Sequence, residues 1–522
     1  MRSTSSSVFL LLVSLAATPA FGQSTDRLRE TVGNRLTENV PPIPGELIER
    51  LNRYQNTRGA SFAGWTDEGC ALISTRFAET AQAHRVCQPL GMREQLTFYP
   101  EPTSIADTAP ASARKGFVFG KDVGGNEFSQ LYWFDFGTRQ ATLLTDGKRT
   151  RHQGAVLSRD GKQLAWSSNA RNGTDTDVWV MDLATRKARA VVAGGGSWGA
   201  HDFSPDGRSL LVSRYVSINE AYPGEVDLQS GKLELFPVDG GKAAFGEFAY
   251  APDGKGVFYI SDEDIDGQRQ EFQTLRHHGP GMKAPRVISA GIAWDVTGFD
   301  IAVDGKHLAY VTNEDGIGTL RVLTLPGLQP VALPELPVGV FDDVDFSPDG
   351  ARLALSINSA TSPSDVHVVD LDTAQLTRWT RSEVGGLDAA KFAPPQLIRY
   401  ATFDRATPDG KPRTIPAFYY RPTNATPGQK LPVVISIHGG PEAQAQPTFN
   451  PSTQFMVNEL GVAVLVPNVR GSSGYGKSYL QLDNGVLRED SVKDIGALLD
   501  WIATQPGLDA SRVGVSGGSY GG

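Results

Sequence analysis

The 522-residue sequence predicts a β-propeller followed by the first part of an α/β-hydrolase domain. Two observations support this fold class. A repeat of roughly 47 residues runs through the longer, N-terminal part of the chain. Beyond it, apolar strands alternate with helices and lead to a serine set among glycines. We expect the propeller to cover residues 61–392 and the hydrolase domain to cover residues 393–522.

The repeat is marked by Asp-Gly turns, each followed by an apolar run typical of a β-strand. The clear turns stand at Asp160-Gly161, Asp206-Gly207, Asp253-Gly254, Asp304-Gly305 and Asp349-Gly350. Two weaker units precede them, around Asp67 and Arg114. Each unit has room for four short strands, so seven blades are expected, with six or eight as alternatives because the first two units are weak.

From residue 393 the pattern indicates a mostly parallel sheet. Leu431–Ile437 and Val462–Val466 are continuous apolar runs, which are typical of strands buried on both faces. Ser491–Gln505 carries apolar residues at helical spacing. Strand, helix and strand in this order indicate the N-terminal part of an α/β-hydrolase domain.

The last strand leads into two overlapping G-x-S-x-G patterns, centred on Ser516 and on Ser519. This pattern is typical of a tight strand-to-helix turn that exposes a nucleophilic serine. We predict Ser519 to be the nucleophile, because glycines flank it on both sides where the strand ends. The backbone N–H of Tyr520 is then one oxyanion donor, and we expect Gly440 to provide a second, because a glycine leaves its N–H unobstructed. The alternative for residues 438–441 is a plain strand-ending turn.

In this fold the acid and the base follow the serine along the chain. Seven of the eight histidines fall in the repeat region, and His438 belongs to a different motif, so none is a suitable general base. We therefore expect the 522 residues to be an inactive fragment of a longer enzyme. The alternative is a natural pseudoenzyme.

The propeller, His438-Gly-Gly-Pro441, Asn468–Gly476 and Gly517–Gly522, in this order, resemble the prolyl oligopeptidase family of serine peptidases. The His-Gly-Gly-Pro form is similar to the acylaminoacyl-peptidase and bacterial dipeptidyl-peptidase branch. The resemblance implies Ser519 as nucleophile and the N–H groups of Gly440 and Tyr520 as the oxyanion hole. It also implies a propeller that admits short peptides and excludes folded proteins. Arg470 is structural or faces the substrate, and we favour the structural role.

Two other functions remain open. One is an esterase that uses the same serine on small acyl esters, although a small ester needs no gating ring. The other is a propeller binding module in which the α/β region is vestigial.

Residues 1–22 have the pattern of a secretory signal peptide, with Arg2, the apolar run Val8–Ala17 and the small residues Ala20 and Gly22 before the cleavage site. The alternative is a buried N-terminal helix. We expect a periplasmic or secreted protein that does not insert into the membrane after signal removal. We expect residues 23–60 to form an extension that packs on the hydrolase domain. The net charge of −9, without a basic run, argues against nucleic acid as a partner.

The two cysteines, Cys70 and Cys87, flank a predicted hairpin and lie within reach of a disulfide; two free buried thiols are the alternative. No cofactor or metal is expected. Asp262–Gly267 contains half of a calcium-loop pattern, but Gln273 stands where a glutamate is needed, so a solvated turn is preferred. Glu127 and Glu220 could bind a substrate amine in the channel, although ordinary loop carboxylates are the preferred interpretation.

Overall fold

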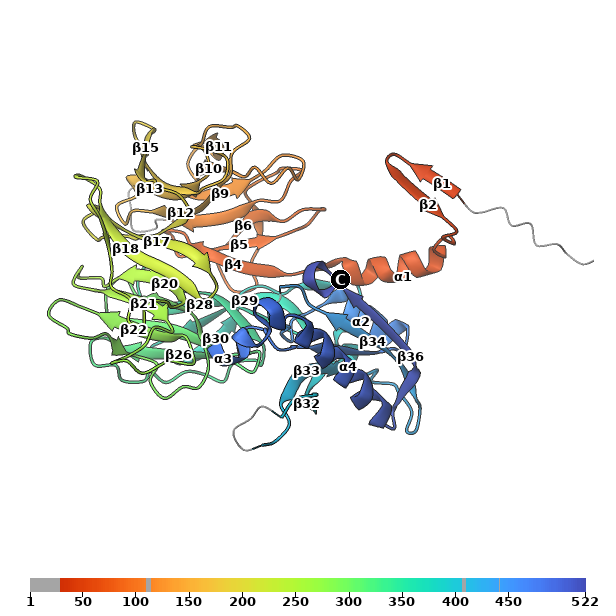
Figure 1. Ribbon diagram of the computed structural model, residues 1–522. Helices are drawn as coiled ribbons and strands as arrows, with labels where there is room; N and C mark the ends of the chain where they lie inside the picture. Colours follow the sequence, from red (N-terminus) through yellow and green to blue (C-terminus); the bar gives the residue numbers. More distant parts are fainter. Residues whose placement is uncertain (1–28, 109–113, 406–409, 441) are drawn as a thin grey trace, which may run out of the picture. The chain divides into compact units, whose positions relative to one another are not determined.

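The computed structural model describes residues 29–108, 114–405, 410–440 and 442–522 (Figure 1). The predicted signal peptide lies outside these residues. The chain divides into two units, residues 1–50 and 51–522. None of the described helices has the length and apolar character that crossing a bilayer requires.

The described part of the first unit begins with a two-stranded hairpin. Its strands β1 (Arg29–Val32) and β2 (Arg35–Glu38) pair antiparallel, and Gly33 in the turn has a φ of +59°. The sequence analysis did not predict this hairpin, because neither strand alternates apolar and polar residues. Helix α1 (Gly45–Gln55) follows and continues into the second unit.

Seven consecutive antiparallel sheets form the propeller, so the predicted seven blades are confirmed (Figure 1). The first three blades consist of β4 (Ala60–Trp65), β5 (Ala71–Thr75), β6 (Gln82–Val86) and β7 (Glu94–Gln95); β8 (Ser104–Thr108), β9 (Gly116–Lys121), β10 (Gln130–Asp135) and β11 (Gln140–Leu143); and β12 (His152–Leu157), β13 (Gln163–Ser168), β14 (Asp177–Asp182) and β15 (Lys187–Val192). The fourth and fifth consist of β16 (Ser197–Phe203), β17 (Ser209–Ser217), β18 (Glu220–Asp227) and β19 (Leu233–Leu235); and β20 (Phe245–Tyr250), β21 (Val257–Ser261), β22 (Thr274–His278) and β23 (Arg286–Val287). The last two consist of β24 (Val296–Ile301), β25 (His307–Glu314) and β26 (Ile317–Thr324); and β27 (Val340–Phe346), β28 (Arg352–Ser359), β29 (Ser362–Asp370) and β30 (Gln375–Arg378).

The sixth blade departs from the expectation of four strands in every blade. Its sheet has three strands, and only an isolated bridge between Leu323 and Pro330 stands where a fourth would pair. Residues 325–338 contain four prolines. A proline has no N–H to donate to a ladder, which explains why this segment does not form a regular strand.

The first strands of neighbouring blades contact one another all the way round, from β4 through β8, β12, β16, β20, β24 and β27 back to β4. The ring closes through side chains, because the first and last blades share no four-stranded sheet. Trp65 packs edge-on against Trp379 of the seventh blade, within one apolar cluster that spans both blades. A short ladder between β3 (Thr57–Arg58) and β31 (Glu383–Val384) adds main-chain pairing beside this closure.

Carboxylates on the first strands connect successive blades. Asp107 accepts a hydrogen bond from the N–H of Leu157 at 2.6 Å, and Asp202 accepts one from the N–H of Tyr250 at 2.8 Å. Two further pairs repeat the pattern around the ring: Glu247 with the N–H of Phe299 and Asp300 with the N–H of Phe346. Each carboxylate therefore ties its blade to the main chain of the next blade.

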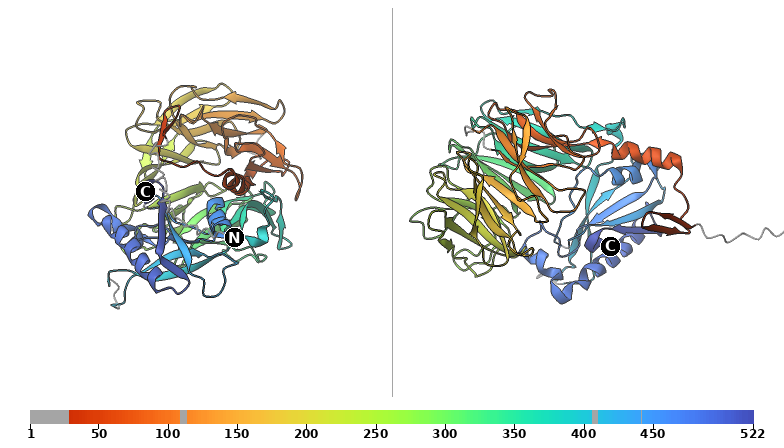
Figure 2. Two further views of the ribbon diagram at one scale, coloured as in Figure 1. Left: turned by 90° about the vertical axis from the view of Figure 1, so that its right-hand side faces the viewer. Right: turned by 90° about the horizontal axis from the view of Figure 1, so that it is seen from above.

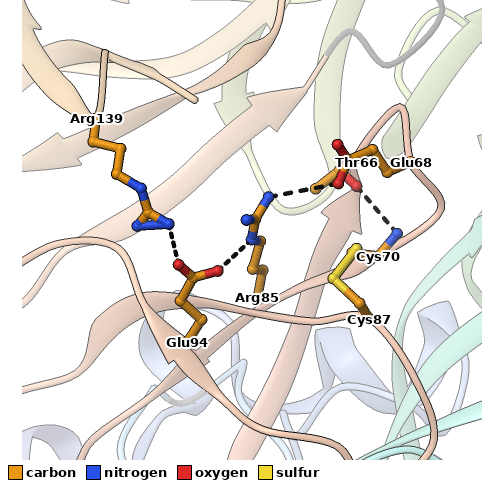
Figure 3. The surroundings of a disulfide bond; sticks show 7 residues. All are labelled: Thr66, Glu68, Cys70, Arg85, Cys87, Glu94 and Arg139. Carbon is orange, nitrogen blue, oxygen red and sulfur yellow. Dashed lines mark hydrogen bonds and ion pairs between the residues drawn. A yellow bond between two sulfur atoms is a disulfide. The ribbon is translucent and has the colours of Figure 1, made fainter. Parts of the chain in front are cut away.

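Cys70 and Cys87 form a disulfide with an S–S distance of 2.07 Å (Figure 3). They stand directly outside Ala71 and Val86, which pair across β5 and β6, so the bond closes the end of this hairpin. Arg85, on β6, donates to Glu94 at 2.6 Å beside the disulfide. The alternative of two free thiols does not apply to this structure.

The hydrolase part contains a five-stranded sheet with the order β32-β33-β35-β34-β36. Its strands are β32 (Pro395–Ala401), β33 (Thr414–Tyr420), β34 (Leu431–Ile437), β35 (Ala463–Pro467) and β36 (Leu508–Gly517). Its helices are α2 (Pro451–Glu459), α3 (Lys477–Leu480) and α4 (Glu489–Thr504), with short 3₁₀ turns at Ala389–Lys391, Gln481–Asp483, Gly485–Leu487 and Ser519–Gly521. β35, β34 and β36 run parallel. Helix α4 lies against the sheet (Figure 2). Its Leu498 and Ile502 belong to one apolar cluster with residues of β34 and β35.

Loops of the fifth and sixth blades hold the hydrolase part. The carboxylate of Glu271 accepts hydrogen bonds from the N–H and the hydroxyl of Ser478, at 2.6 and 2.7 Å. Lys477 forms an ion pair with Asp262 at 3.2 Å, within the segment that carries half of a calcium-loop pattern. In the sixth blade, Asn313 donates to Gln444 at 2.6 Å. The Asp262 turn therefore serves as a contact between the two parts of the chain.

We predict that Asp107 makes the stability of the propeller depend on pH. Burial raises the pKa of Asp107 to about 7. The folded state then binds more protons than the unfolded state between about pH 4 and 7, so stability falls as pH rises through this window. Asp107→Asn cannot ionise and keeps an oxygen for the N–H of Leu157. It should reduce the loss of unfolding free energy between pH 5 and pH 8 by roughly 1–3 kcal/mol in urea titrations.

The control is Asp253→Asn, in an exposed turn, where the side chain accepts a hydrogen bond from the N–H of Lys255. It should leave the pH profile of the unfolding free energy parallel to that of the unmodified protein. A parallel profile for Asp107→Asn as well would contradict the prediction.

Candidate active site

Ser519 lies in a strained turn at the tip of β36. It begins the 3₁₀ turn Ser519–Gly521, two residues after the strand ends, and its side chain is exposed. Its φ is +55°, a left-handed conformation that residues other than glycine adopt rarely and at a cost. A serine held in this way at the end of a parallel strand has the geometry of a nucleophile elbow.

The surrounding glycines show which of the two overlapping patterns forms the turn. A Cβ atom on Gly517 would lie 1.9 Å from the carbonyl oxygen of Gly521, and one on Gly521 would lie 2.3 Å from that of Ile437. Gly514 and Gly518 have no such constraint: the nearest atom to a Cβ on Gly514 is at 3.9 Å, and none lies within 4 Å of one on Gly518. The required glycines therefore stand two residues before and two residues after Ser519, so the turn is centred there.

Ser516, the centre of the other pattern, belongs to β36. It pairs with Ser436 in the parallel ladder between β34 and β36. Its backbone is therefore part of the regular sheet and not of the turn.

The glycine segment that follows β34 passes directly beside Ser519. A Cβ atom on Gly439 would lie 3.1 Å from the Cβ and 3.6 Å from the Oγ of Ser519. Gly440 has a φ of +134°, and a Cβ there would lie 2.6 Å from the backbone nitrogen of Glu442. The structure thus brings the Gly439–Gly440 segment and the turn of Ser519 together, as an oxyanion site requires. Pro441 lies outside the described residues.

Tyr520 follows Ser519 in the 3₁₀ turn, and its side chain points away to neighbouring loops. Its hydroxyl lies 3.3 Å from that of Ser491 and 3.5 Å from a carboxylate oxygen of Asp483. The guanidinium of Arg488 stands over its ring at 5.1 Å. These contacts fix the turn that carries the N–H of Tyr520.

His438 supports the glycine segment. Its Nε2 lies 3.0 Å from the hydroxyl of Ser472, which donates to the carbonyl of Val469 at 2.7 Å. Burial lowers the pKa of His438, so the imidazole is neutral at pH 7. This histidine links the end of β34 to the loop after β35, in agreement with its rejection as a general base.

Arg470 lies in a buried ion network behind this loop. Its guanidinium donates to Asp494 at 2.8 and 2.9 Å and to Asp404 at 3.1 Å. Burial alone would lower the pKa of Arg470, but the two carboxylates raise it above its ordinary value. Arg470 therefore joins α4 to the segment after β32, which favours the structural interpretation over a contact with substrate.

The carboxylates considered for binding a substrate amine have cationic partners in the propeller. Glu127 forms an ion pair with Arg151 at 3.3 Å. Glu220 accepts from Lys242 at 2.7 Å and from the hydroxyl of Tyr222 at 2.5 Å.

Among the residues that the structure describes, no three side chains of His, Cys, Asp or Glu are placed to hold a metal ion together.

Several known proteins resemble this chain in sequence. Residues 447–522 match the model described as the prolyl oligopeptidase family. Dipeptidyl aminopeptidase BIII of Pseudoxanthomonas mexicana is 24% identical over 431 residues, which are 77% of this chain and 58% of that protein. The acylamino-acid-releasing enzyme of Sus scrofa is 33% identical over 132 residues, 25% of this chain and 16% of that enzyme. The matched part of the chain thus spans 58% or less of the length of these relatives.

Solved structures share the fold. A prolyl endopeptidase structure superposes with a TM-score of 0.74 at 17% identity, covering 92% of this chain and 72% of that one. A puromycin hydrolase superposes with a TM-score of 0.72 at 19% identity, covering 90% and 75% of the two chains. At these identities the likeness shows the arrangement of propeller and hydrolase sheet only.

The glycines around Ser519 predict a matched set of variants. Gly517→Ala and Gly521→Ala each force a Cβ against a backbone carbonyl, and overpacking of this kind costs about 1–3 kcal/mol or more of unfolding free energy. Gly518→Ala should cost less than about 0.5 kcal/mol, because its φ of −130° suits alanine and the space is open. Urea unfolding measures all three. Equal effects of the three variants would show that the turn is not centred on Ser519.

The ion network predicts a large cost for removing its cation. Arg470→Met leaves the buried Asp494 without its partner and should destabilise the protein by about 3–5 kcal/mol. Arg512→Met removes the exposed pair with Asp509 and should cost no more than about 1 kcal/mol. Both values come from urea unfolding of the variants. A small effect of Arg470→Met would argue against a structural role.

Proposed function

We propose that this chain is a serine peptidase of the prolyl oligopeptidase family and that it hydrolyses short peptides through an acyl-enzyme formed at Ser519. The observation that carries the proposal is the left-handed backbone of Ser519. Gly517 and Gly521, two residues before and after it, have no room for a Cβ atom. Such a turn is costly to keep and exposes one hydroxyl at the tip of a strand.

In the proposed reaction the hydroxyl of Ser519 attacks the peptide carbonyl. The peptide C–N bond breaks, the amine leaves with a proton, and the acyl group stays on the serine oxygen until water releases it. The N–H groups of Tyr520 and Gly440 stabilise the oxyanion. The placement of the glycine segment supports this role, because a Cβ atom built on Gly439 would lie 3.6 Å from the Oγ of Ser519.

The proposal assigns the general base and its acidic partner to residues that follow Ser519 in the complete protein. Two facts support this assignment. The chain order of the fold places both groups after the serine, and His438 is engaged by Ser472.

Short peptides are the proposed substrates, because the resemblance to the prolyl oligopeptidase family implies a propeller that limits access to the site. The contacts of Glu271 with Ser478 and of Asp262 with Lys477 hold a propeller loop against the hydrolase part. Two relatives are named as a dipeptidyl aminopeptidase and an acylamino-acid-releasing enzyme, which also suits small substrates.

A periplasmic or secreted location completes the proposal. The signal-peptide pattern of residues 1–22 and the disulfide between Cys70 and Cys87 both support an oxidising compartment.

A fluorophosphonate probe tests the proposed nucleophile in the protein expressed from its complete reading frame. Ser519→Ala should abolish labelling and lower kcat/KM on peptide p-nitroanilides by at least roughly a thousandfold. Ser516→Ala is the matched control, because Ser516 lies within the sheet, and it should still label. Labelling that survives in Ser519→Ala would contradict the proposal, and a protein that never labels would favour a binding module.

A further inference from the structure

A cavity of about 410 Å³ lies between the fourth and fifth blades of the propeller. All of its lining residues belong to the propeller, and none belongs to the hydrolase part. The outermost strands of these two blades are short, because β19 has three residues and β23 has two. Few side chains are therefore present at the outer edge to fill the space between the blades. The volume falls within the range of roughly 300–1,000 Å³ that is typical of small-molecule sites.

Aromatic rings that lie nearly parallel form one wall of this cavity. Phe248 on β20 and Tyr259 on β21 are cross-strand partners, and their ring centroids are 5.8 Å apart at an angle of 12°. The ring of Phe245 lies 5.8 Å from that of Phe248 at an angle of 20°. These three residues are the aromatic wall of the cavity. Aromatic rings of this kind pack against a ligand ring and attract cationic groups.

Tyr250 brings a buried hydroxyl to the same cavity. The residue is 5% exposed and stands two positions after Phe248, so both side chains lie on one face of β20. Its hydroxyl has no partner in hydrogen-bond geometry among the residues that the structure describes. Burial, and then the negative charge of Glu225, raise the pKa of Tyr250, so the hydroxyl keeps its proton at pH 7. A ligand with a polar group at this point would satisfy a hydroxyl that the protein leaves unpaired.

Glu225 on β18 lines the cavity from the side of the fourth blade. Its side chain is half-buried, and within the described ranges of the chain it forms no ion pair. A carboxylate in a partly desolvated position is stabilised by a cation that donates hydrogen bonds to it. This residue therefore favours a positively charged ligand.

The other Asp, Glu and Lys side chains that line the cavity do not change this balance. Glu263 accepts hydrogen bonds from the hydroxyl of Tyr259 at 2.6 Å and from the guanidinium of Arg276 at 3.2 Å, so its charge is already compensated. Asp239 and Lys283 are both exposed and carry opposite charges. The charge that is left without a partner is the negative charge of Glu225.

We propose that this cavity binds a small aromatic ammonium compound, with its ammonium group held by Glu225 and Tyr250 and its ring packed on the aromatic wall. The ammonium N–H groups donate to the carboxylate and to the hydroxyl oxygen, both of which can accept. A neutral ligand leaves the carboxylate unpaired, and an aliphatic amine loses the packing of ring on ring. The inference is independent of the chemistry proposed for Ser519, because the hydrolase part contributes no residue to the cavity.

Isothermal titration calorimetry with 2-phenylethylammonium tests the site in the protein expressed from its complete reading frame. Two analogues separate the contributions of charge and ring. The first, 2-phenylethanol, keeps the ring and lacks the charge, and the second, 2-cyclohexylethylammonium, keeps the charge and lacks the aromatic ring. The probe should bind at least about fivefold more tightly than either analogue.

Two variants test the polar contacts. Glu225→Gln should weaken binding of the probe by about 10- to 100-fold and leave binding of 2-phenylethanol unchanged. Tyr250→Phe should weaken binding of the probe by about 3- to 10-fold. The same variant should not lower the unfolding free energy, because it removes a hydroxyl that has no partner in the free protein. Glu335→Gln, at an exposed position after β26, is the matched control and should change neither binding nor stability.

Urea unfolding shows that each variant is folded before it is titrated. The proposal is overturned if the unmodified protein shows no saturable binding of 2-phenylethylammonium, or if it binds 2-phenylethanol equally well. It is also overturned if folded Glu225→Gln binds the probe as tightly as the unmodified protein. Neither result affects the assignment of Ser519, which fluorophosphonate labelling tests separately.

Discussion

The contact between the turn after β36 and the end of β34 is the constraint on which the candidate site depends. Gly521 lies so close to the carbonyl of Ile437 that no side chain fits, and a Cβ atom on Gly439 would lie 3.1 Å from the Cβ of Ser519. Two neighbouring parallel strands therefore end in segments that touch through glycine backbones. This contact keeps Ser519 in its left-handed conformation and exposes its hydroxyl beside the N–H groups of the facing loop.

The propeller holds the hydrolase part in place, and buried carboxylates hold the propeller blades together. Asp107, Asp202 and Asp300 each accept an N–H from the next blade, so the ring holds together without a shared strand at its closure. The loop between β21 and β22 of the fifth blade then holds the hydrolase part through Glu271 and Asp262.

Local patterns made much of this structure predictable, and contacts between distant residues account for what was missed. The Asp-Gly turns predicted the blades, and the glycines around Ser519 predicted the elbow, because both depend on neighbouring residues. The prolines after β26 disrupted a strand that the repeat alone implied. The role of Asp107 depends on Leu157 in the next blade, and the role of Arg470 depends on Asp404 and Asp494 in distant segments. No spacing in the sequence brings such pairs together.

Tandem mass spectrometry of the protein treated with a fluorophosphonate tests the central claim most directly. Trypsin cleaves after Arg512, so Ser516 and Ser519 fall in one peptide that begins at Val513 and can be told apart by fragmentation. The geometry of the turn predicts the adduct on Ser519. An adduct on Ser516, or on a serine elsewhere in the chain, would contradict it.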